Sequence, residues 1–295
     1  MSAPSGPADP GPTVRVGAPM WAHRPWVGRH FPRDTPPGDE LVAYATWCTA
    51  VEGNTTFYAL PSPPSVARWA DQTPVSFRFC CKLPRAITHE RRLRDADAEL
   101  RETLVRLDPL GPRLGPTLIQ LPASFTPEDL DVLARFCRRL PADRAWAVEV
   151  RHPGFFAGGA AERPLDDLLT GAGINRVILD SRALFDAPPR TPAELDAWEN
   201  KPRLPVRPVA TADQPVVRLI GRTDTDADLS RWAPWWDRIV GWVNRGCRPI
   251  VFTHTPDNLD APALARAVHA ELAARIPHLA PLPDPVTDGE QLGLF

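Results

Sequence analysis

Acidic and basic side chains follow short apolar runs at many points of this chain of 295 residues. The run that ends in "VEVRH" places Glu149, Arg151 and His152 within four residues, and the run "SFRFCCK" ends in Lys82. Arginine binds anions through paired hydrogen bonds, a carboxylate can move a proton, and a lysine shielded from water can act as a base or nucleophile. Together these residue types favour an acid/base reaction on an anionic ligand.

Two groups of candidate site residues come from these run ends. The predicted catalytic residues are Lys82, Glu149, His152 and Asp180, of which Glu149 or Lys82 moves the proton and the other two orient the reacting groups. The predicted ligand-binding residues, in which the arginines at 151, 218 and 222 hold the anion, are Glu52, Asn54, Tyr58, Thr88, His89, Gln120, Arg151, Arg182, Arg218, Gly221, Arg222 and His254.

Other interpretations of these residues stay open. A carboxylate or arginine at such a position is often part of a structural ion-pair network, and the set could equally form a non-catalytic module that binds a ligand or a nucleic-acid end. Divalent metals take ligands of the types found at Glu52, Glu149, Asp180, His152 and His254. However, the chain has no H-x-H or H-E-x-x-H spacing, and the arginines compete for the carboxylates, so no metal is predicted. No nucleotide cofactor is predicted either, because the chain lacks G-x-G-x-x-G and a G-K-[ST] phosphate loop.

Eight short apolar runs must position these side chains. They predict strands at 14–18, 49–53, 76–82, 117–121, 145–150, 175–180, 215–220 and 249–254. Helical patterns lie between most of them, for example at 127–140, with Thr126 as N-cap, and at 264–276. Apolar strands that alternate with helices predict an α/β fold, a closed (β/α)8 TIM-like barrel, with a doubly wound open sheet as the alternative. In both folds ligands bind at the carboxyl ends of the strands.

The barrel is expected to fill residues 13–277 as a single domain. Residues 1–12 are rich in Pro, Gly, Ser and Ala and predict a disordered leader. The segment 180–215 is long, polar and rich in proline, so it predicts a loop or insertion after strand six. Residues 278–295 predict a flexible proline-rich linker that ends in a docking peptide.

The composition of the chain limits which kinds of protein and which partners are expected. A formal net charge of −2 argues against a generally basic surface, so direct DNA binding gains no support, although a local basic patch stays open. Five cysteines without a C-x-x-C pair indicate reduced thiols. No apolar run approaches the roughly 20 residues of a membrane span, and no signal-peptide pattern is present, so a cytoplasmic protein is expected. Only Lys82 and Lys201 among the 34 basic residues are lysines, which makes each of them informative.

Several blocks of the chain resemble one known family. The blocks "VEGNTTFYALPSPPSVARWADQTPVSFRFCCKLPRAITHERRL", "LGPTLIQLPASF", "WAVEVRHPGFF", "VILDSRALF", "VVRLIGR" and "FTHTPDNLDAPALARAVHAEL" are similar, in order, to those of the YecE-like family, domain of unknown function 72. The resemblance covers about residues 14 to 276 and implies a TIM barrel with a polar cavity at its mouth. It implies no reaction. Gly53 and the stretch after the first strand depart from the family's pattern, which puts a ligand contact from the first loop in doubt.

The pentapeptide "QLGLF" at 291–295 resembles the short motif by which bacterial polymerases and repair proteins attach to the sliding clamp of DNA replication. Leucine and phenylalanine anchors suit an apolar pocket, and a proline-rich linker can present them. The predicted partner-binding residues are Gln291, Leu292, Leu294 and Phe295. The alternative is that the Leu-Phe pair packs back on the barrel.

Overall fold

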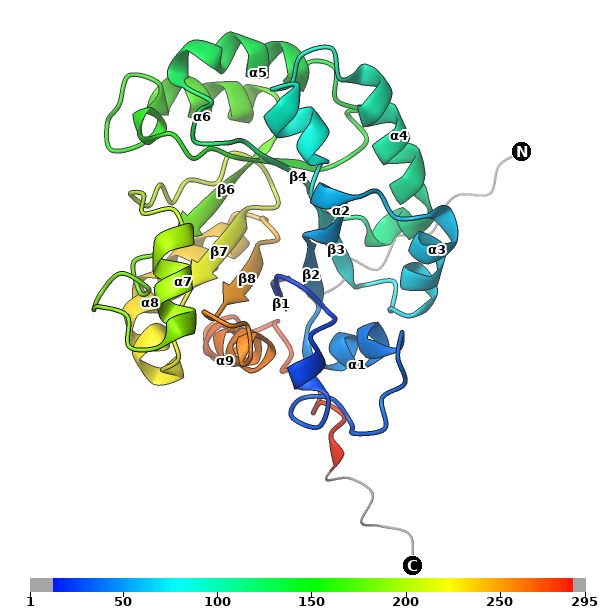
Figure 1. Cartoon of the computed structure of the whole chain (residues 1–295). Coiled ribbons are helices and arrows are strands. Elements are labelled where there is room, and N and C mark those ends of the chain that lie inside the picture. Colours follow the sequence, from blue (N-terminus) through cyan, green and yellow to red (C-terminus); the bar gives the residue numbers. More distant parts are fainter. Residues whose placement is uncertain (1–12, 289–295) are drawn as a thin grey trace, which may run out of the picture.

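The structure is a computed structural model of the chain, and it describes residues 13–288. Its strands occupy the centre and its helices surround them (Figure 1). The strands are β1 (Arg15–Ala18), β2 (Ala50–Gly53), β3 (Arg78–Cys81), β4 (Thr117–Gln120), β5 (Trp146–Glu149), β6 (Asn175–Asp180), β7 (Val216–Ile220) and β8 (Ile250–His254). Each coincides with one of the predicted apolar runs.

All strand pairs are parallel, in the order β3-β2-β1-β8-β7-β6-β5-β4. The two end strands, β3 and β4, also meet through the isolated bridges Phe79↔Leu114 and Lys82↔Leu118. The Leu83 N–H donates to the carbonyl oxygen of Leu118 at 2.9 Å across this seam. The sheet therefore forms a nearly closed barrel, as the sequence predicted, and the open-sheet alternative is wrong.

Helices follow most strands and cover the outside of the barrel (Figure 1). They are α1 (Glu40–Trp47), α2 (Thr55–Tyr58), α3 (Pro63–Asp71), α4 (Asp97–Leu107), α5 (Leu130–Cys137), α6 (Glu162–Gly171), α7 (Pro192–Asn200), α8 (Thr225–Asn244) and α9 (Ala261–Ala273). A capping box at Thr126 opens the turn that leads into α5, as the sequence predicted.

Helix α7 lies inside the segment 180–215, which the sequence reading described only as a loop or insertion. Its start has a clear local cause. Thr191 is the N-cap and accepts a hydrogen bond from the Glu194 N–H at 3.1 Å, and Pro192 occupies the first helical turn. The prolines on either side of these nine residues hid the helix from pattern recognition.

The apolar core has an inner and an outer part, as expected when successive side chains of a strand point to opposite faces. Two large outer clusters pack the strands against the helices. A smaller cluster fills the barrel interior with one residue from each of six strands, β2 to β7, and two from β8: Ala50, Cys80, Leu118, Ala147, Val177, Val216, Ile250 and Phe252. The polar side chains of the mouth lie above this inner layer.

The segment after α9 lies against the barrel as far as it is described. Leu279 is buried, and Arg266 on α9 donates a hydrogen bond to the Pro283 carbonyl at 2.8 Å. Asp288 accepts a hydrogen bond from the Arg33 N–H at 2.8 Å and pairs with its guanidinium at 3.0 Å. The predicted leader and the predicted partner-binding residues 291–295 lie outside the described residues. No helix within 13–288 is long and apolar enough to cross a membrane.

Candidate functional site

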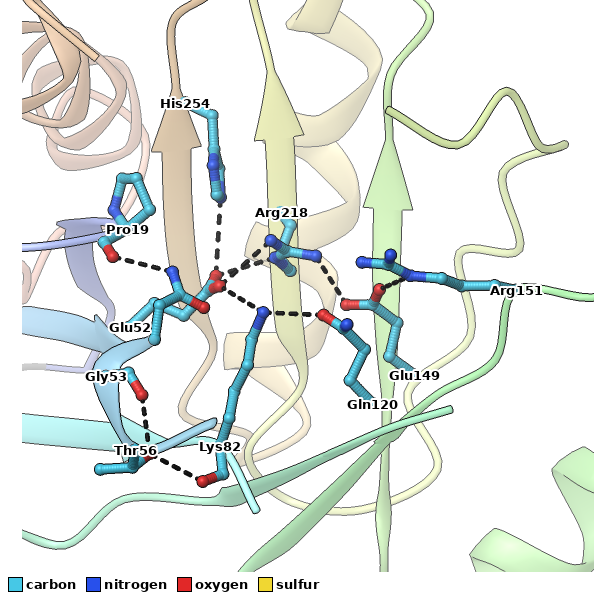
Figure 2. A network of polar contacts seen from close by, with 11 residues as sticks. Pro19, Glu52, Gly53, Thr56, Lys82, Gln120, Glu149, Arg151, Arg218 and His254 are labelled. Carbon is cyan, nitrogen blue, oxygen red and sulfur yellow. Dashed lines mark hydrogen bonds and ion pairs between the residues drawn. The ribbon is translucent and has the colours of Figure 1, made fainter. Parts of the chain in front are cut away.

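A ring of polar side chains lies two residues beyond the apolar inner layer. Because strand side chains alternate, the residue two positions after an inward apolar side chain also points inward, one layer nearer the carboxyl end. On six strands this next position is polar and buried: Glu52 follows Ala50, Lys82 follows Cys80, Gln120 follows Leu118, Glu149 follows Ala147, Arg218 follows Val216 and His254 follows Phe252. All six are predicted site residues, and the fold brings them together (Figure 2).

Arg218 on β7 is the centre of this ring. Its Nε and Nη2 atoms donate to the two carboxylate oxygens of Glu52 at 2.8 and 3.1 Å, and its Nη1 donates to Glu149 Oε2 at 2.7 Å (Figure 2). Burial disfavours its charge, but the two carboxylates outweigh burial and raise the pKa of Arg218. A guanidinium that is held by two buried carboxylates is rigid and permanently charged.

Lys82 lies beside Arg218 and its carboxylate partners. Its ammonium donates to Gln120 Oε1 at 2.7 Å and pairs with Glu52 Oε1 at 3.2 Å (Figure 2). The Thr56 hydroxyl donates to the Lys82 carbonyl at 2.7 Å, which fixes the backbone at this strand end. Burial lowers the pKa of Lys82, and the Glu52 carboxylate opposes this shift.

Glu149 also binds Arg151, whose Nε donates to Glu149 Oε1 at 2.7 Å. Burial alone raises the pKa of Glu149, but the charges of Arg218, Arg151 and Lys82 outweigh burial and lower that pKa to about 2. A carboxylate with this pKa is a weak base at neutral pH. The structure therefore favours a role for Glu149 in holding the two arginines rather than in moving a proton.

His254 closes the ring from β8. Its Nε2 lies 3.5 Å from Glu52 Oε2 and has no hydrogen-bond partner within the described part of the chain. Burial lowers the pKa of His254 to about 3, despite the opposing effect of Glu52. At neutral pH the imidazole is therefore uncharged.

Lys201 is a site residue that the sequence reading did not place. It follows α7 directly as the C-cap residue and is partly buried. Burial lowers its pKa to about 8, with a further contribution from the positive charge of Arg218, whereas Glu52 opposes the shift. These charges belong to the ring, so the protonation of Lys201 is coupled to the charge of the ring. The scarcity of lysine in the chain was the signal that could have identified it.

Besides Arg182, which pairs with Asp180, four predicted site residues have partners away from the ring. Asp180 points from β6 toward α8, where it binds Arg182 at 2.7 Å and accepts a hydrogen bond from Trp235 Nε1 at 2.8 Å. Arg222 is held by Glu194 at 2.9 Å and by backbone carbonyls of the segment before α7. Gly221 packs against Asp228 of α8.

His152 is the fourth. It caps a short turn, where its Nδ1 accepts a hydrogen bond from the Gly154 N–H at 3.1 Å. The orienting role predicted for Asp180 and His152 therefore gains no contact with the ring.

The remaining predicted residues lie in the loops after β2 and β3. The Asn54 amide donates to the Pro19 carbonyl at 2.8 Å and so ties the first loop to the second. Thr88 and His89 are hydrogen-bonded at 2.9 Å, and the His89 ring lies 5.0 Å from that of Phe57. Tyr58, which also contacts Phe57, is 81% exposed.

The donor set does not resemble a metal centre. No group of three or more His, Cys, Asp or Glu residues suited to a metal occurs in residues 13–288. Both ring carboxylates are already bound by guanidinium or ammonium groups. The arrangement instead offers cations for an anion and amines for proton transfer.

The chain resembles known proteins in both sequence and fold. A family model described as "Protein of unknown function DUF72" matches residues 15–287. The chain belongs to the DUF72 family. It is 40% identical over 270 residues to "UPF0759 protein YecE" of Escherichia coli K12, covering 92% of this chain and 96% of that protein. The resemblance seen in the sequence blocks is thereby confirmed.

Two solved DUF72 structures have the same fold. A DUF72 family protein of Enterococcus faecalis V583 matches with a TM-score of 0.66 at 16% identity, over 92% of this chain and 99% of that one. One from Thermotoga maritima MSB8 matches with a TM-score of 0.64 at 23% identity, over 88% and 96% of the two chains. At these identities the match concerns the fold alone.

Proposed function

We propose that the barrel mouth binds a small anionic ligand, such as a sugar phosphate or nucleotide, and acts on it by proton transfer. The observation that carries this proposal is the charge of the mouth. Three basic side chains, Lys82, Arg151 and Arg218, contact two carboxylates, and the charge of Lys201 acts on the same groups, which leaves two positive charges in excess. A dianionic phosphate balances that excess.

The environment of His89 supports an excess of positive charge. Burial, together with the charges of Arg85, Arg151 and Lys82, lowers the pKa of His89 to about 4, whereas Glu149 opposes the shift. The imidazole at the rim therefore stays neutral and can donate or accept a hydrogen bond. A positive potential in a partly buried cleft raises both the affinity and the association rate of an anion.

The residues that can contact a ligand differ from the buried residues that fix the geometry of the site. Glu52, Glu149 and Arg218 are almost completely buried and mutually bonded. The Arg151 side chain is 24% exposed and uses its Nε for Glu149, so its two Nη groups are left to donate to an anion. Lys82 and Lys201, with lowered pKa values, supply the amines for proton transfer.

Aromatic groups at the rim favour an organic anion over a bare inorganic ion. The exposed ring of Tyr58 contacts Phe57 on α2, and the ring of Phe57 in turn contacts that of His89. A planar base or the apolar face of a sugar can stack on such a ring. The non-catalytic alternative uses the same contacts and differs only in the absence of turnover.

Binding is tested first with inorganic phosphate and ribose 5-phosphate by thermal shift and calorimetry. The expected result is stabilisation of the unchanged protein by both anions, with a weaker effect in high salt. Arg151→Met should abolish the shift, because it removes the exposed guanidinium. Arg182→Met is the matched control, since its arginine pairs with Asp180 outside the ring. Equal binding by both variants, or no binding by the unchanged protein, would contradict the proposal.

The segment near residue 288 supports a second proposal, that "QLGLF" recruits the protein to a bacterial sliding clamp. Asp288 is held on the barrel by Arg33, so only two residues separate this anchor from Gln291. A motif tethered so closely is presented at a defined place on the surface rather than on a long linker. A pull-down of purified clamp by the full chain and by the variant Leu294→Ala/Phe295→Ala tests this proposal. Recovery of equal amounts of clamp by the two proteins would contradict it.

A further inference from the structure

The carboxylate oxygens of the ring are all engaged by the ring's own donors. Arg218 and Lys82 bind the two oxygens of Glu52 at 2.8 to 3.2 Å. Arg218 and Arg151 each bind one oxygen of Glu149 at 2.7 Å. The side chains of Glu52 and Glu149 are 0% and 3% exposed. A ligand that enters the mouth therefore meets no free carboxylate acceptor of the ring.

The hydrogen-bonding groups that the ring leaves unused are N–H donors. An ammonium can only donate, so Gln120 turns its Oε1 toward Lys82, at 2.7 Å, and its Nε2 elsewhere. Gln120 Nε2 has no partner in residues 13–288 and is not one of the buried atoms that lack a partner, so it is open to solvent. Arg151 is 24% exposed and binds Glu149 through Nε, and no residue of the described chain binds its two Nη groups. Lys82 keeps one N–H besides its contacts with Gln120 and Glu52.

These donors belong to neighbouring side chains. Gln120 is paired with Glu149 in the register of β4 and β5, and Glu149 holds Arg151 at 2.7 Å. On its other side Gln120 holds Lys82. Figure 2 shows Gln120 between Lys82 and the Glu149–Arg151 pair. One small anion can therefore contact all three donor side chains.

We propose that this site selects a terminal oxyanion that carries no proton, such as the dianion of a phosphate monoester, and rejects the protonated monoanion. The inference rests on the proposed anion site and names the ionic form of the ligand that it takes, with Gln120 as the specificity-determining residue. Every oxygen of an unprotonated oxyanion can accept an N–H. A P–OH group must also donate, and the ring leaves no oxygen to receive its proton. A donor left without an acceptor lowers affinity about tenfold or more.

Charge alone also favours a dianion over a monoanion, so the comparison has to be made at equal charge. Methanesulfonate and the methylphosphonate monoanion have the same charge and nearly the same shape, and only the phosphonate carries a proton. Methylphosphonate loses that proton above neutral pH, whereas methanesulfonate does not titrate. Attraction by the excess positive charge acts equally on the two monoanions, but hydrogen bonds to the ring do not.

NMR titration of the isotopically labelled full-length protein with each ligand measures the two affinities. At pH 5.5 we expect methanesulfonate to bind at least about tenfold more tightly than methylphosphonate. At pH 8.5 methylphosphonate should bind at least as tightly as methanesulfonate. The charged or titratable groups of the ring are Glu52, Lys82, Glu149, Arg151, Arg218 and His254, and His89 and Lys201 are electrostatically coupled to them. Because methanesulfonate meets the same groups at each pH, the ratio of the two affinities cancels their titration.

The variant Gln120→Glu tests the specificity-determining residue. One oxygen of the new carboxylate can still face Lys82, and the other replaces the Nε2 donor by an acceptor. The added charge repels both monoanions, but only the phosphonate can donate to the new oxygen, so the preference for methanesulfonate at pH 5.5 should vanish or reverse. Gln214→Glu is the matched control and should keep the preference, because Gln214 precedes β7 at the opposite end of the strands from the ring.

Two outcomes would overturn the inference while leaving the anion site in place. One is equal affinity of the unchanged protein for the two monoanions at pH 5.5, and the other is an undiminished preference for methanesulfonate in Gln120→Glu. Failure of both ligands to bind at pH 8.5, together with no thermal shift by phosphate, would overturn the anion site itself.

Discussion

Arg218 joins Glu52 and Glu149 in a buried network, so each of the three depends on the others. Breaking a buried pair by removing one partner leaves an uncompensated charge, which costs about 3–5 kcal/mol. We therefore expect Arg218→Met to lower the free energy of unfolding by that amount in urea denaturation at pH 7. Arg182→Met should cost less, because its guanidinium is half exposed and the buried Asp180 keeps the hydrogen bonds from Trp235 and from the backbone N–H of residue 182.

A companion variant keeps this prediction testable if Arg218→Met does not fold. Replacing both carboxylates as well, in Glu52→Gln/Glu149→Gln/Arg218→Met, removes the unpaired charges and should recover most of the lost stability. A triple variant no more stable than the single one would show that the cost comes from packing around Arg218 rather than from charge.

His254 gives the stability a pH dependence of known sign. Its pKa is about 3 in the folded chain, against an ordinary value of 6.5, so the unfolded chain binds this proton first as the pH falls. Stability is therefore full above pH 6.5 and declines as the pH falls toward 3. Between pH 7.5 and 5.0, His254→Gln should lose about 2 kcal/mol less than the unchanged protein.

Other histidines do not obscure this comparison. Burial also lowers the pKa values of His89 and His269 to about 4, but both are present in each protein and cancel in the difference. Urea denaturation at the two pH values measures it. Equal losses in the two proteins would mean that the pKa of His254 is not lowered in the folded chain.

At the scale of elements, β7 and α8 meet closely at Gly221. A methyl group there would lie 2.1 Å from Asp228 Oδ2, and that oxygen also accepts the Arg222 N–H. We expect Gly221→Ala to destabilise the protein by about 1–3 kcal/mol through overpacking. Gly171→Ala is the control, because Gly171 ends α6 with nothing within 4 Å of the added methyl. It should be neutral or raise stability by up to about 1 kcal/mol, and equal thermal midpoints for both variants would contradict the argument.

The eight strands and their order were accessible to sequence reasoning, whereas the inward faces were not. In a parallel barrel both faces of a strand are apolar, so hydrophobicity does not tell which polar residue points inward. Asp180 shows the difficulty: Val177 lies in the inner layer, which puts Asp180, three residues on, on the outer face toward Trp235. Glu149, two residues after the inner Ala147, points inward.

Lys201 was absent from the predicted site residues for a different reason. It follows α7 rather than a strand, so a search of strand ends could not reach it, and the proline-rich flanks concealed the helix that positions it. The charges of Arg218 and Glu52, which act on Lys201, come from strands distant in the sequence. That arrangement is a tertiary property which no local pattern encodes. The ring residues, by contrast, were predicted because strand ends meet by topology alone.

For the whole molecule, the seam between β3 and β4 is the weakest closure of the barrel. Only isolated bridges join these strands, whereas β7 and β8 pair continuously over five residues each. Local opening exposes amides where few hydrogen bonds must break together. We expect the seam amides of Leu83 and Gly115 to exchange with deuterium about ten- to a hundredfold faster than those of Gly221 and Ile250, measured by NMR.

A ligand at the mouth should change this pattern selectively. The seam bridge at Lys82 and Leu118 adjoins the ammonium that Gln120 and Glu52 hold, so an anion bound to Lys82 would restrain the seam from one side. Saturating phosphate should therefore slow exchange at Leu83 more than at Gly115, which lies toward the other end of the strands. Uniform slowing of all four amides would instead indicate global stabilisation, and fast exchange at Gly221 and Ile250 without ligand would place the weak point of the barrel elsewhere.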